Sequence, residues 1–248
     1  VNTKQKILSN KLSAAIVGAS KLVLSGKYDR HFPLSVWQTG SGTQTNMNVN
    51  EVIANLANKK LTGKLGTNSP VHPNDHVNKS QSTNDSFPSA INIATAVLVK
   101  DSLIPSMKRI QTTLKGQSKK WDKIIKVGRT HLQDATPLSL GQEFSGYEAM
   151  ISSNIKRVEQ SFGSLLNLAQ GGTAVGSGLN TKKNFDKLVV NEISKIAKIK
   201  FKPAINKFQA LAAHDAIVEM SGSLNVLTTD LFKIANDIRL LGSGPRSG

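Results

Sequence analysis

The chain has 248 residues, no cysteine and a formal net charge of +16, from 32 Lys and Arg against 16 Asp and Glu. The absence of cysteine excludes a disulfide scaffold, a thiolate metal site and a cysteine nucleophile, and no apolar run approaches the roughly 18 residues of a membrane span. The lysines are scattered without aromatic side chains among them, so we expect neither a nucleic-acid partner nor a membrane partner.

Apolar residues recur at helical spacing through most of the chain, whereas period-two alternation is nearly absent. The sequence therefore predicts an all-α fold. Pro105 predicts a kink in the third helix, and Thr136 and Pro137 predict the N-cap and the first residue of the fourth. The predicted helices span residues 2–26, 51–61, 87–118, 137–169, 183–198 and 206–241.

The last predicted helix, 206–241, is informative because it is long and apolar around much of its circumference. At about 1.5 Å per residue it would extend roughly 50 Å, whereas a compact chain of this size has a radius of gyration of about 18 Å. A helix that is apolar on several sides must be buried on several sides. We therefore expect the long helices of identical chains to bundle together.

Polar segments separate these helices, and loops held on a rigid scaffold often carry function. Residues 38–48 place hydroxyl and amide side chains among glycines ahead of a helix, which suits either anion binding or ordinary capping. Residues 128–137 contain His131, which could act in acid/base chemistry or be a packed side chain. Residues 171–180 are rich in glycine and could be a tight link between helices or a ligand contact.

The remaining polar segment, 71–85, raises the question of a metal because it contains His72, Asp75 and His76. Pro73 argues against a helical turn between the two histidines, and no third ligand follows at a regular spacing. We therefore expect no metal at this segment. Hydrogen bonding of its side chains to an oxygen-rich anion fits better.

Taken together, the four polar segments resemble the fumarase/aspartase superfamily, and specifically its class II fumarate hydratases. The resemblance covers essentially the whole chain, and no single motif would suffice. The matching stretches are Ser-Gly-Thr-Gln-Thr-Asn-Met-Asn at 41–48, His-Pro-Asn-Asp at 72–75, Ser-Gln-Ser-Thr-Asn-Asp at 80–85 and Gly-Arg-Thr-His-Leu-Gln-Asp at 128–134.

The resemblance implies a bundle of long helices that assembles into a homotetramer, with active sites shared between subunits. It also implies reversible trans addition of water to fumarate, which gives L-malate in the tricarboxylic acid cycle, without a metal or an organic cofactor. The partner would be a small dicarboxylate. The compartment would be the cytoplasm, with the mitochondrial matrix as the alternative.

Residue roles follow from the same resemblance. His131 would take part in acid/base handling of the water. His72, Pro73, Asn74 and Asp75 would match the family's second dicarboxylate site, although Ser69 stands where related enzymes can carry Arg. The substrate carboxylates and hydroxyl would be bound by Ser41, Gly42, Thr43, Ser82, Thr83, Asn84 and Thr130.

The sequence also departs from the family by an omission. The family's catalytic base is a serine in a loop of the pattern Gly-Ser-Ser-x-Met-Pro-Gly-Lys-x-Asn-Pro, which does not occur in this sequence. We therefore expect both ends of the family's chain to be missing, and no activity from a molecule that stops at Gly248. The expected domains are an N-terminal helical domain at 1–85 and a central long-helix bundle at 86–248.

Two other functions share part of this pattern. Aspartase, which adds ammonia, also has the His-Pro-Asn-Asp-His and Ser-Gln-Ser-Thr-Asn-Asp motifs. The form of residues 37–44 and 171–178 favours the hydratase, as does His131, where aspartases tend to have Gln. A non-catalytic structural relative is the other alternative, and the retained His131 and hydroxyl groups argue against it.

Overall fold

The structure is a computed structural model that describes residues 1–246. The chain divides into two compact units: residues 1–93 with 166–214, and residues 94–165 with 215–248. These units do not coincide with the expected segments 1–85 and 86–248, because residues 166–214 return to pack with the first part of the chain. Residues 247–248 lie outside the described part.

The first unit is organised around a pair of helices, α1 (Asn10–Leu24) and α2 (Thr43–Thr62). Small buried side chains allow the two to approach closely, with the 3-10 turn η1 (Asp29–His31) between them in the chain. The π-helical turn η2 (Pro73–Val77) packs on α2. The core of this pair contains Ala15, Ala19, Ile53, Ala54, Ala57 and Val71.

The rest of the first unit is contributed by later parts of the chain. Helix α6 (Phe185–Ala197) buries Phe185 and Val190. Strand β3 (Asn167–Leu168) pairs in parallel with β4 (Lys202–Pro203), and the short helix α7 (Lys207–Ala212) follows. Helix α3 (Thr83–Leu98) begins in this unit and ends in the second.

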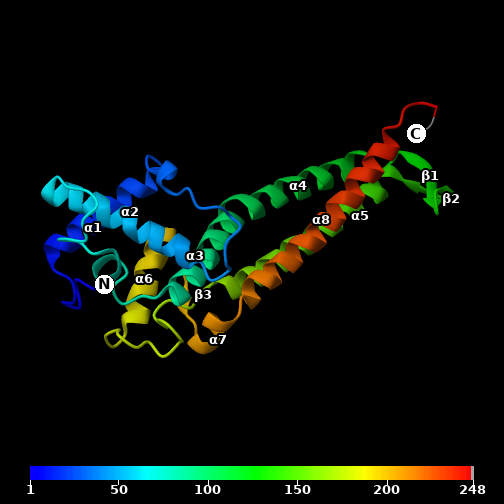
Figure 1. Ribbon diagram of the computed structural model, residues 1–248. Helices are drawn as coiled ribbons and strands as arrows, with labels where there is room; N and C mark the ends of the chain where they lie inside the picture. Colours follow the sequence, from blue (N-terminus) through cyan, green and yellow to red (C-terminus); the bar gives the residue numbers. More distant parts are fainter. Residues whose placement is uncertain (247–248) are drawn as a thin grey trace. The chain divides into compact units, whose positions relative to one another are not determined.

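The second unit consists of three long helices and a hairpin. Helix α5 (Leu140–Leu165) packs against both α4 (Ile104–Lys120) and α8 (Asp215–Leu241). In Figure 1, α5 and α8 run along each other, and α4 converges on them toward the hairpin. The antiparallel hairpin of β1 (Ile125–Thr130) and β2 (Gln133–Ser139) lies at one end of this bundle. Side chains of α5 supply much of the core, including Phe144, Tyr147, Ile151 and Val158.

The fold class is confirmed as a helical bundle of the predicted kind, with only short strands in the described residues. The helix predicted at 183–198 agrees with α6. The predicted irregularity at Pro105 is also present: the π-helical turn η3 (Val99–Leu103) separates α3 from α4, and Pro105 lies in the first turn of α4. Proline is tolerated there because the first turn needs no N–H donor.

Four predicted helix boundaries are wrong. Helix α1 begins at Asn10 and not at residue 2, because residues 2–8 form turns and bends. Helix α2 begins at Thr43 and not at residue 51, since Asn and Thr side chains in its first turns disguise the pattern. Residues 133–139 form strand β2, because they pair with β1, so Thr136 and Pro137 do not begin a helix. Ser139 caps α5 instead: its Oγ accepts from the Gln142 N–H at 3.0 Å, and Gln142 Oε1 accepts from the Ser139 N–H at 2.9 Å.

The fourth wrong boundary concerns 206–241, which is two helices and not one. Helix α7 ends at Ala212, and Ala213 is extended with φ of −139° and ψ of 152° before α8 starts at Asp215. Neither proline nor glycine marks this break in the sequence. It is therefore set by tertiary structure, not by local propensity.

Among residues 1–246, one helical stretch, Thr83–Lys120, is long and apolar enough to cross a membrane by length and composition alone. The core helix of a soluble protein passes the same test. Its second half, α4, is largely polar and packs along α5, with Met107 and Leu114 buried. This packing is that of a bundle helix.

Candidate active site

The first polar segment ends at the N-terminus of α2, and Gly42 fixes how the two meet. Gly42 is the N-cap with φ of 73°, and no side chain caps the first turn. A Cβ atom at this position would overlap the ring of Phe87, so only glycine fits. Ser41 and Thr43 are exposed on either side of it. Free N–H groups at a helix start with hydroxyls beside them favour an anion.

The first turn of α3 carries three of the predicted binding residues, and a capping box holds it. Ser82 Oγ accepts from the Asn84 N–H at 3.3 Å, and Asp85 Oδ1 accepts from the Ser82 N–H at 2.9 Å. Thr83 is buried, and its Oγ1 accepts from Asn46 Nδ2 at 2.9 Å. The turn is therefore tied both to its own helix and to α2.

Asp85 is fully buried and connects this turn to the glycine-rich segment. Its Oδ2 accepts from the N–H groups of Gly171 and Thr173, each at 2.9 Å. Asn84 reaches the same segment, because its Nδ2 donates to the carbonyl oxygen of Ala174 at 2.8 Å. Burial raises the pKa of Asp85, while the N–H donors of Ser82, Thr173 and Gly171 act in the opposite direction.

A pocket of about 430 Å³ lies beside these elements in the first unit. Ser41 and Asn84 line it together with apolar side chains such as Phe87 and Phe208. His214, from the break between α7 and α8, is the single ionisable side chain among the described lining residues. The structure thus places Ser41 and Asn84, predicted from distant motifs, in one cavity with a histidine that the sequence did not single out.

His131 lies at the tip of the β1–β2 hairpin in the second unit. Thr130 pairs with Gln133, so His131 and Leu132 form a two-residue loop, and both have positive φ, 51° and 62°. Such turns usually contain Asn, Asp or Gly, and a leucine in this conformation is strained. Strain of this kind concentrates at functional sites.

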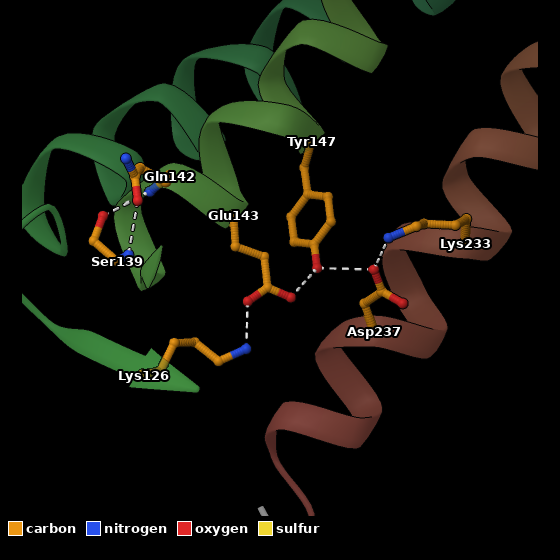
Figure 2. A network of polar contacts seen from close by, with 7 residues as sticks. All are labelled: Lys126, Ser139, Gln142, Glu143, Tyr147, Lys233 and Asp237. Atoms are coloured by element: carbon orange, nitrogen blue, oxygen red, sulfur yellow. Dashed lines mark hydrogen bonds and ion pairs between the residues drawn. The ribbon is translucent and has the colours of Figure 1, made fainter. Parts of the chain in front are cut away.

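A second pocket, of about 1050 Å³, is lined by Thr130 and His131 together with residues of α5 and α8. The hairpin that carries them is held by Lys126, whose Nζ lies 2.6 Å from Glu143 Oε2 on α5. Figure 2 shows this contact continuing through Tyr147 to Asp237 on α8. The result is a chain of polar contacts that links β1, α5 and α8.

Tyr147 is the centre of that chain. Its hydroxyl lies 2.9 Å from both Glu143 Oε1 and Asp237 Oδ2, and the ammonium group of Lys233 contacts Asp237 (Figure 2). Burial and hydrogen bonds to the two carboxylates raise the pKa of Tyr147 above its usual value. The phenol therefore stays protonated, and its single hydrogen is donated to one of the two carboxylates at a time.

The predicted second dicarboxylate site forms a single π-helical turn that begins at Pro73. The prediction that Pro73 prevents a helical turn between His72 and His76 is wrong, because proline occupies the first position, where no N–H is required. His72 Nδ1 accepts from the N–H groups of Asn74 at 3.2 Å and Asp75 at 3.1 Å. An Nδ1 that accepts is unprotonated, so its 3.6 Å approach to Asp75 Oδ2 is not an ion pair in this geometry.

Within residues 1–246, no group of three or more His, Cys, Asp or Glu side chains is arranged to hold a metal ion. In this π-helical turn, His76 Nδ1 accepts a hydrogen bond from the His72 N–H at 2.8 Å. The Nδ1 atoms of His72 and His76 are thus both hydrogen-bonded to backbone N–H groups.

Two residues at the candidate site were missed by sequence reasoning. Asp85 ends a motif that was recognised, but its burial depends on contacts with residues 171 and 173. A signal was available, because Ser at the N-cap followed three residues later by an acid is a capping box. His214 had no comparable signal, because the helix break that carries it is not marked in the sequence.

Comparison with known proteins identifies the family. A family model described as "Lyase" matches residues 1–248. Relatives include fumarate hydratase class II of Rickettsia conorii, 58% identical over all of this chain and 54% of its own length. The mitochondrial fumarate hydratase of Saccharomyces cerevisiae is 57% identical over all of this chain and 51% of its own length. The chain thus spans about half the length of the curated relatives it matches.

Solved structures give the same result. A class II fumarase from Schistosoma mansoni superimposes with a TM-score of 0.96 at 43% identity, covering 100% of this chain and 55% of that one. A fumarate lyase:delta crystallin from Brucella melitensis, bound to cobalt, superimposes with a TM-score of 0.93 at 39% identity, covering 100% and 54%. Because the family model spans the whole chain, this chain belongs to the lyase family.

Proposed function

We propose that the protein containing this chain is a fumarate hydratase that interconverts fumarate and L-malate. The observation that carries the proposal is the occurrence of Ser41 and Asn84 in one pocket next to a helix N-terminus, in a chain 58% identical to a class II fumarate hydratase over its whole length. The substrate class is a small dicarboxylate.

The chemistry explains why these residue types suit the reaction. Removal of a proton next to one carboxylate of malate generates an aci-carboxylate, whose additional charge must be stabilised by donors already in place. Ser41, Gly42 and Thr43 present hydroxyl and N–H groups at the start of α2. Ser82, Thr83 and Asn84 form the first turn of α3, where Asn84 provides amide donors and Thr83 holds the turn against α2.

The acid/base chemistry would involve the β1–β2 hairpin. His131 would handle the proton of the water that adds or leaves, and Thr130 beside it would hydrogen bond to the substrate. The left-handed hairpin loop fixes the backbone from which the imidazole extends, because neither His131 nor Leu132 can relax without breaking the β1–β2 pairing. Preorganisation of an acid/base group typically contributes about 10²–10⁴-fold to rate.

The assembly belongs to the same proposal. We expect a homotetramer in which subunits share active sites, and a bundle of identical chains accounts for the exposed apolar side chains Val218, Val226 and Phe232 on α8. His72, Pro73, Asn74 and Asp75 would form a second dicarboxylate site near the entrance. The compartment would be the cytoplasm, with the mitochondrial matrix as the alternative, and two of the relatives are named mitochondrial.

A direct assay tests the function. The longest natural chain that contains this sequence is purified and mixed with fumarate, and the loss of fumarate absorbance is followed with and without ammonia. A decrease that needs only water, with L-malate as product, supports the hydratase. A decrease that requires ammonia and gives aspartate would identify aspartase, and no reaction under either condition would indicate a structural relative.

A further inference from the structure

We propose that Asp85 is a positioning residue for substrate binding. It acts by holding the first turn of α3, which carries Asn84 and is called the Asn84 turn below, against the glycine-rich segment 171–174. This inference rests on the proposed function, because it concerns how the same dicarboxylate site is kept in shape. Asp85 lies next to Asn84 but is fully buried, so its carboxylate does not touch substrate.

The hydrogen bonds of Asp85 divide between two segments. Oδ1 accepts from the Ser82 N–H at 2.9 Å and from Ser86 Oγ at 3.3 Å, which keeps the first turn of α3 in its capped form. Oδ2 accepts from the N–H groups of Gly171 and Thr173, both at 2.9 Å. Acceptor positions on both oxygens are therefore used, which only a carboxylate provides.

The partner segment is itself rigid, so the contact fixes a position. Gly171 has φ of 93° and Thr173 has φ of 57°, and both residues are buried. A Cβ atom at Gly171 would overlap Asp186 on α6, which shows that the backbone packs directly on that helix. A segment confined in this way is a firm support for a hydrogen-bonded carboxylate.

Asn84 uses the same support. Its Nδ2 donates to the Ala174 carbonyl at 2.8 Å, one residue beyond the Thr173 N–H that Asp85 holds. The side chain is thereby fixed at the wall of the pocket that Ser41 also lines. If the Asp85 contacts were lost, the turn and the segment could separate, and Asn84 would lose its fixed direction.

A double-mutant cycle separates positioning from simple structural support. Asp85→Asn, Asn84→Ala and the double variant are made in the longest natural chain that contains this sequence, and kcat and KM for fumarate are measured. In Asp85→Asn the amide NH₂ meets N–H donors, so we expect kcat/KM to fall about 10-fold or more. Because Asp85 acts through Asn84, the same change in the Asn84→Ala background should cost no more than about 2-fold.

Matched variants keep the result interpretable. Asp186→Asn removes another carboxylate at the same segment, which pairs with Lys207 at 2.7 Å, and should lower the thermal midpoint without changing kcat/KM. If Asp85→Asn does not fold, Asp85→Glu replaces it in the cycle, because it keeps the charge and displaces it by one methylene group. The same non-additivity is expected from it.

The outcomes are distinct. The positioning role would be overturned if the fold-decreases in kcat/KM of the two single variants multiplied in the double variant, or if the Asp85 variant had an unchanged kcat/KM. Either result would leave the proposed hydratase function intact. A wild-type protein that does not hydrate fumarate would overturn the proposed function, and the role of Asp85 in it. Non-additive losses in a wild type that hydrates fumarate would support both.

Discussion

The ammonium group of Lys126 lies 2.6 Å from the carboxylate of Glu143, and this contact joins the hairpin that carries His131 to helix α5. Both side chains are about one-fifth exposed. An ion pair that is mostly removed from water is costly to break on one side only, because the remaining charge stays buried.

Glu143→Gln should therefore destabilise the protein by about 2 kcal/mol or more. The change leaves Lys126 without its counter-ion and weakens the acceptor for Tyr147. The measurement is the urea midpoint, with Glu159→Gln as control, since Glu159 pairs with Lys108 on an exposed surface and should change stability by no more than about 0.5 kcal/mol. Equal effects of the two variants would contradict the anchoring role.

The raised pKa of Tyr147 predicts that the free energy of unfolding decreases in alkali. Its pKa in the folded state is raised by burial and by Asp237 and Glu143, whereas a tyrosine in an unfolded chain ionises near pH 10. Above about pH 10 the folded state retains a proton that the unfolded state releases, so stability falls as pH rises, by up to about 1.4 kcal/mol per pH unit. Tyr147→Phe should remove this slope. The measurement is the free energy of unfolding at pH 9 and at pH 11, about one unit below and above the pKa of a tyrosine in an unfolded chain.

His131→Asn should lower kcat by about 10²-fold or more in the longest natural chain that contains this sequence. Asparagine tolerates the left-handed backbone of the hairpin tip, where φ is 51°. The fold should therefore be retained, which far-ultraviolet circular dichroism would verify. Leu132→Asn changes the neighbouring loop residue without removing the imidazole, and should leave kcat within about 3-fold of wild type. Undiminished turnover of His131→Asn would exclude it from the reaction.

Gly42→Ala should cost about 2 kcal/mol or more, because the new Cβ overlaps the Phe87 ring as well as straining a backbone with φ of 73°. Gly63 is the matched control: its φ is 76°, and no atom lies within 4 Å of the position of its Cβ. Gly63→Ala should show only the backbone cost, about 1 kcal/mol. If Gly42→Ala and Gly63→Ala lowered thermal stability by similar amounts, the overlap with the Phe87 ring would be relieved at little cost.

His214→Phe should raise KM for fumarate several-fold, about 3- to 10-fold, with a smaller effect on kcat. His214 lines the pocket of Ser41 and Asn84, where we expect its imidazole to offer a hydrogen bond to substrate, and phenylalanine keeps its bulk without that group. His31→Phe provides the control, because His31 is exposed and does not line that pocket. An unaltered KM in His214→Phe would show that this side of the pocket does not contact substrate.

The sequence predicted those parts of the fold whose signals are local. Helix α6 has a clear apolar face that includes buried Phe185 and Val190, so its predicted bounds agree closely with the structure. Strand β2 was missed because Leu138 and Leu140 continue the apolar spacing of α5 into a segment whose pairing partner is β1. Pairing between strands is a non-local property, and helical periodicity cannot report it.

The candidate site shows the same division. Ser41 and Asn84 were identified from motif resemblance, and the structure places both at one pocket. The contacts that bury Asp85 Oδ2 could not be predicted, because the N–H groups that donate to it are 86 and 88 residues further along the chain. The break that presents His214 is likewise decided by tertiary packing, in a stretch of Ala-Ala-His-Asp that would otherwise favour a helix.

The divided first unit has a consequence for synthesis on the ribosome. Residues 1–93 emerge before residues 94–165, and residues 166–214, which complete the unit, emerge only after both. Until Gly171 and Thr173 leave the exit tunnel, the carboxylate of Asp85 lacks the donors that hold Oδ2. A nascent chain arrested before residue 166 therefore has helices α1 and α2 available to pair. Its Asn84 turn still lacks the hydrogen bonds that segment 171–174 donates to Asp85.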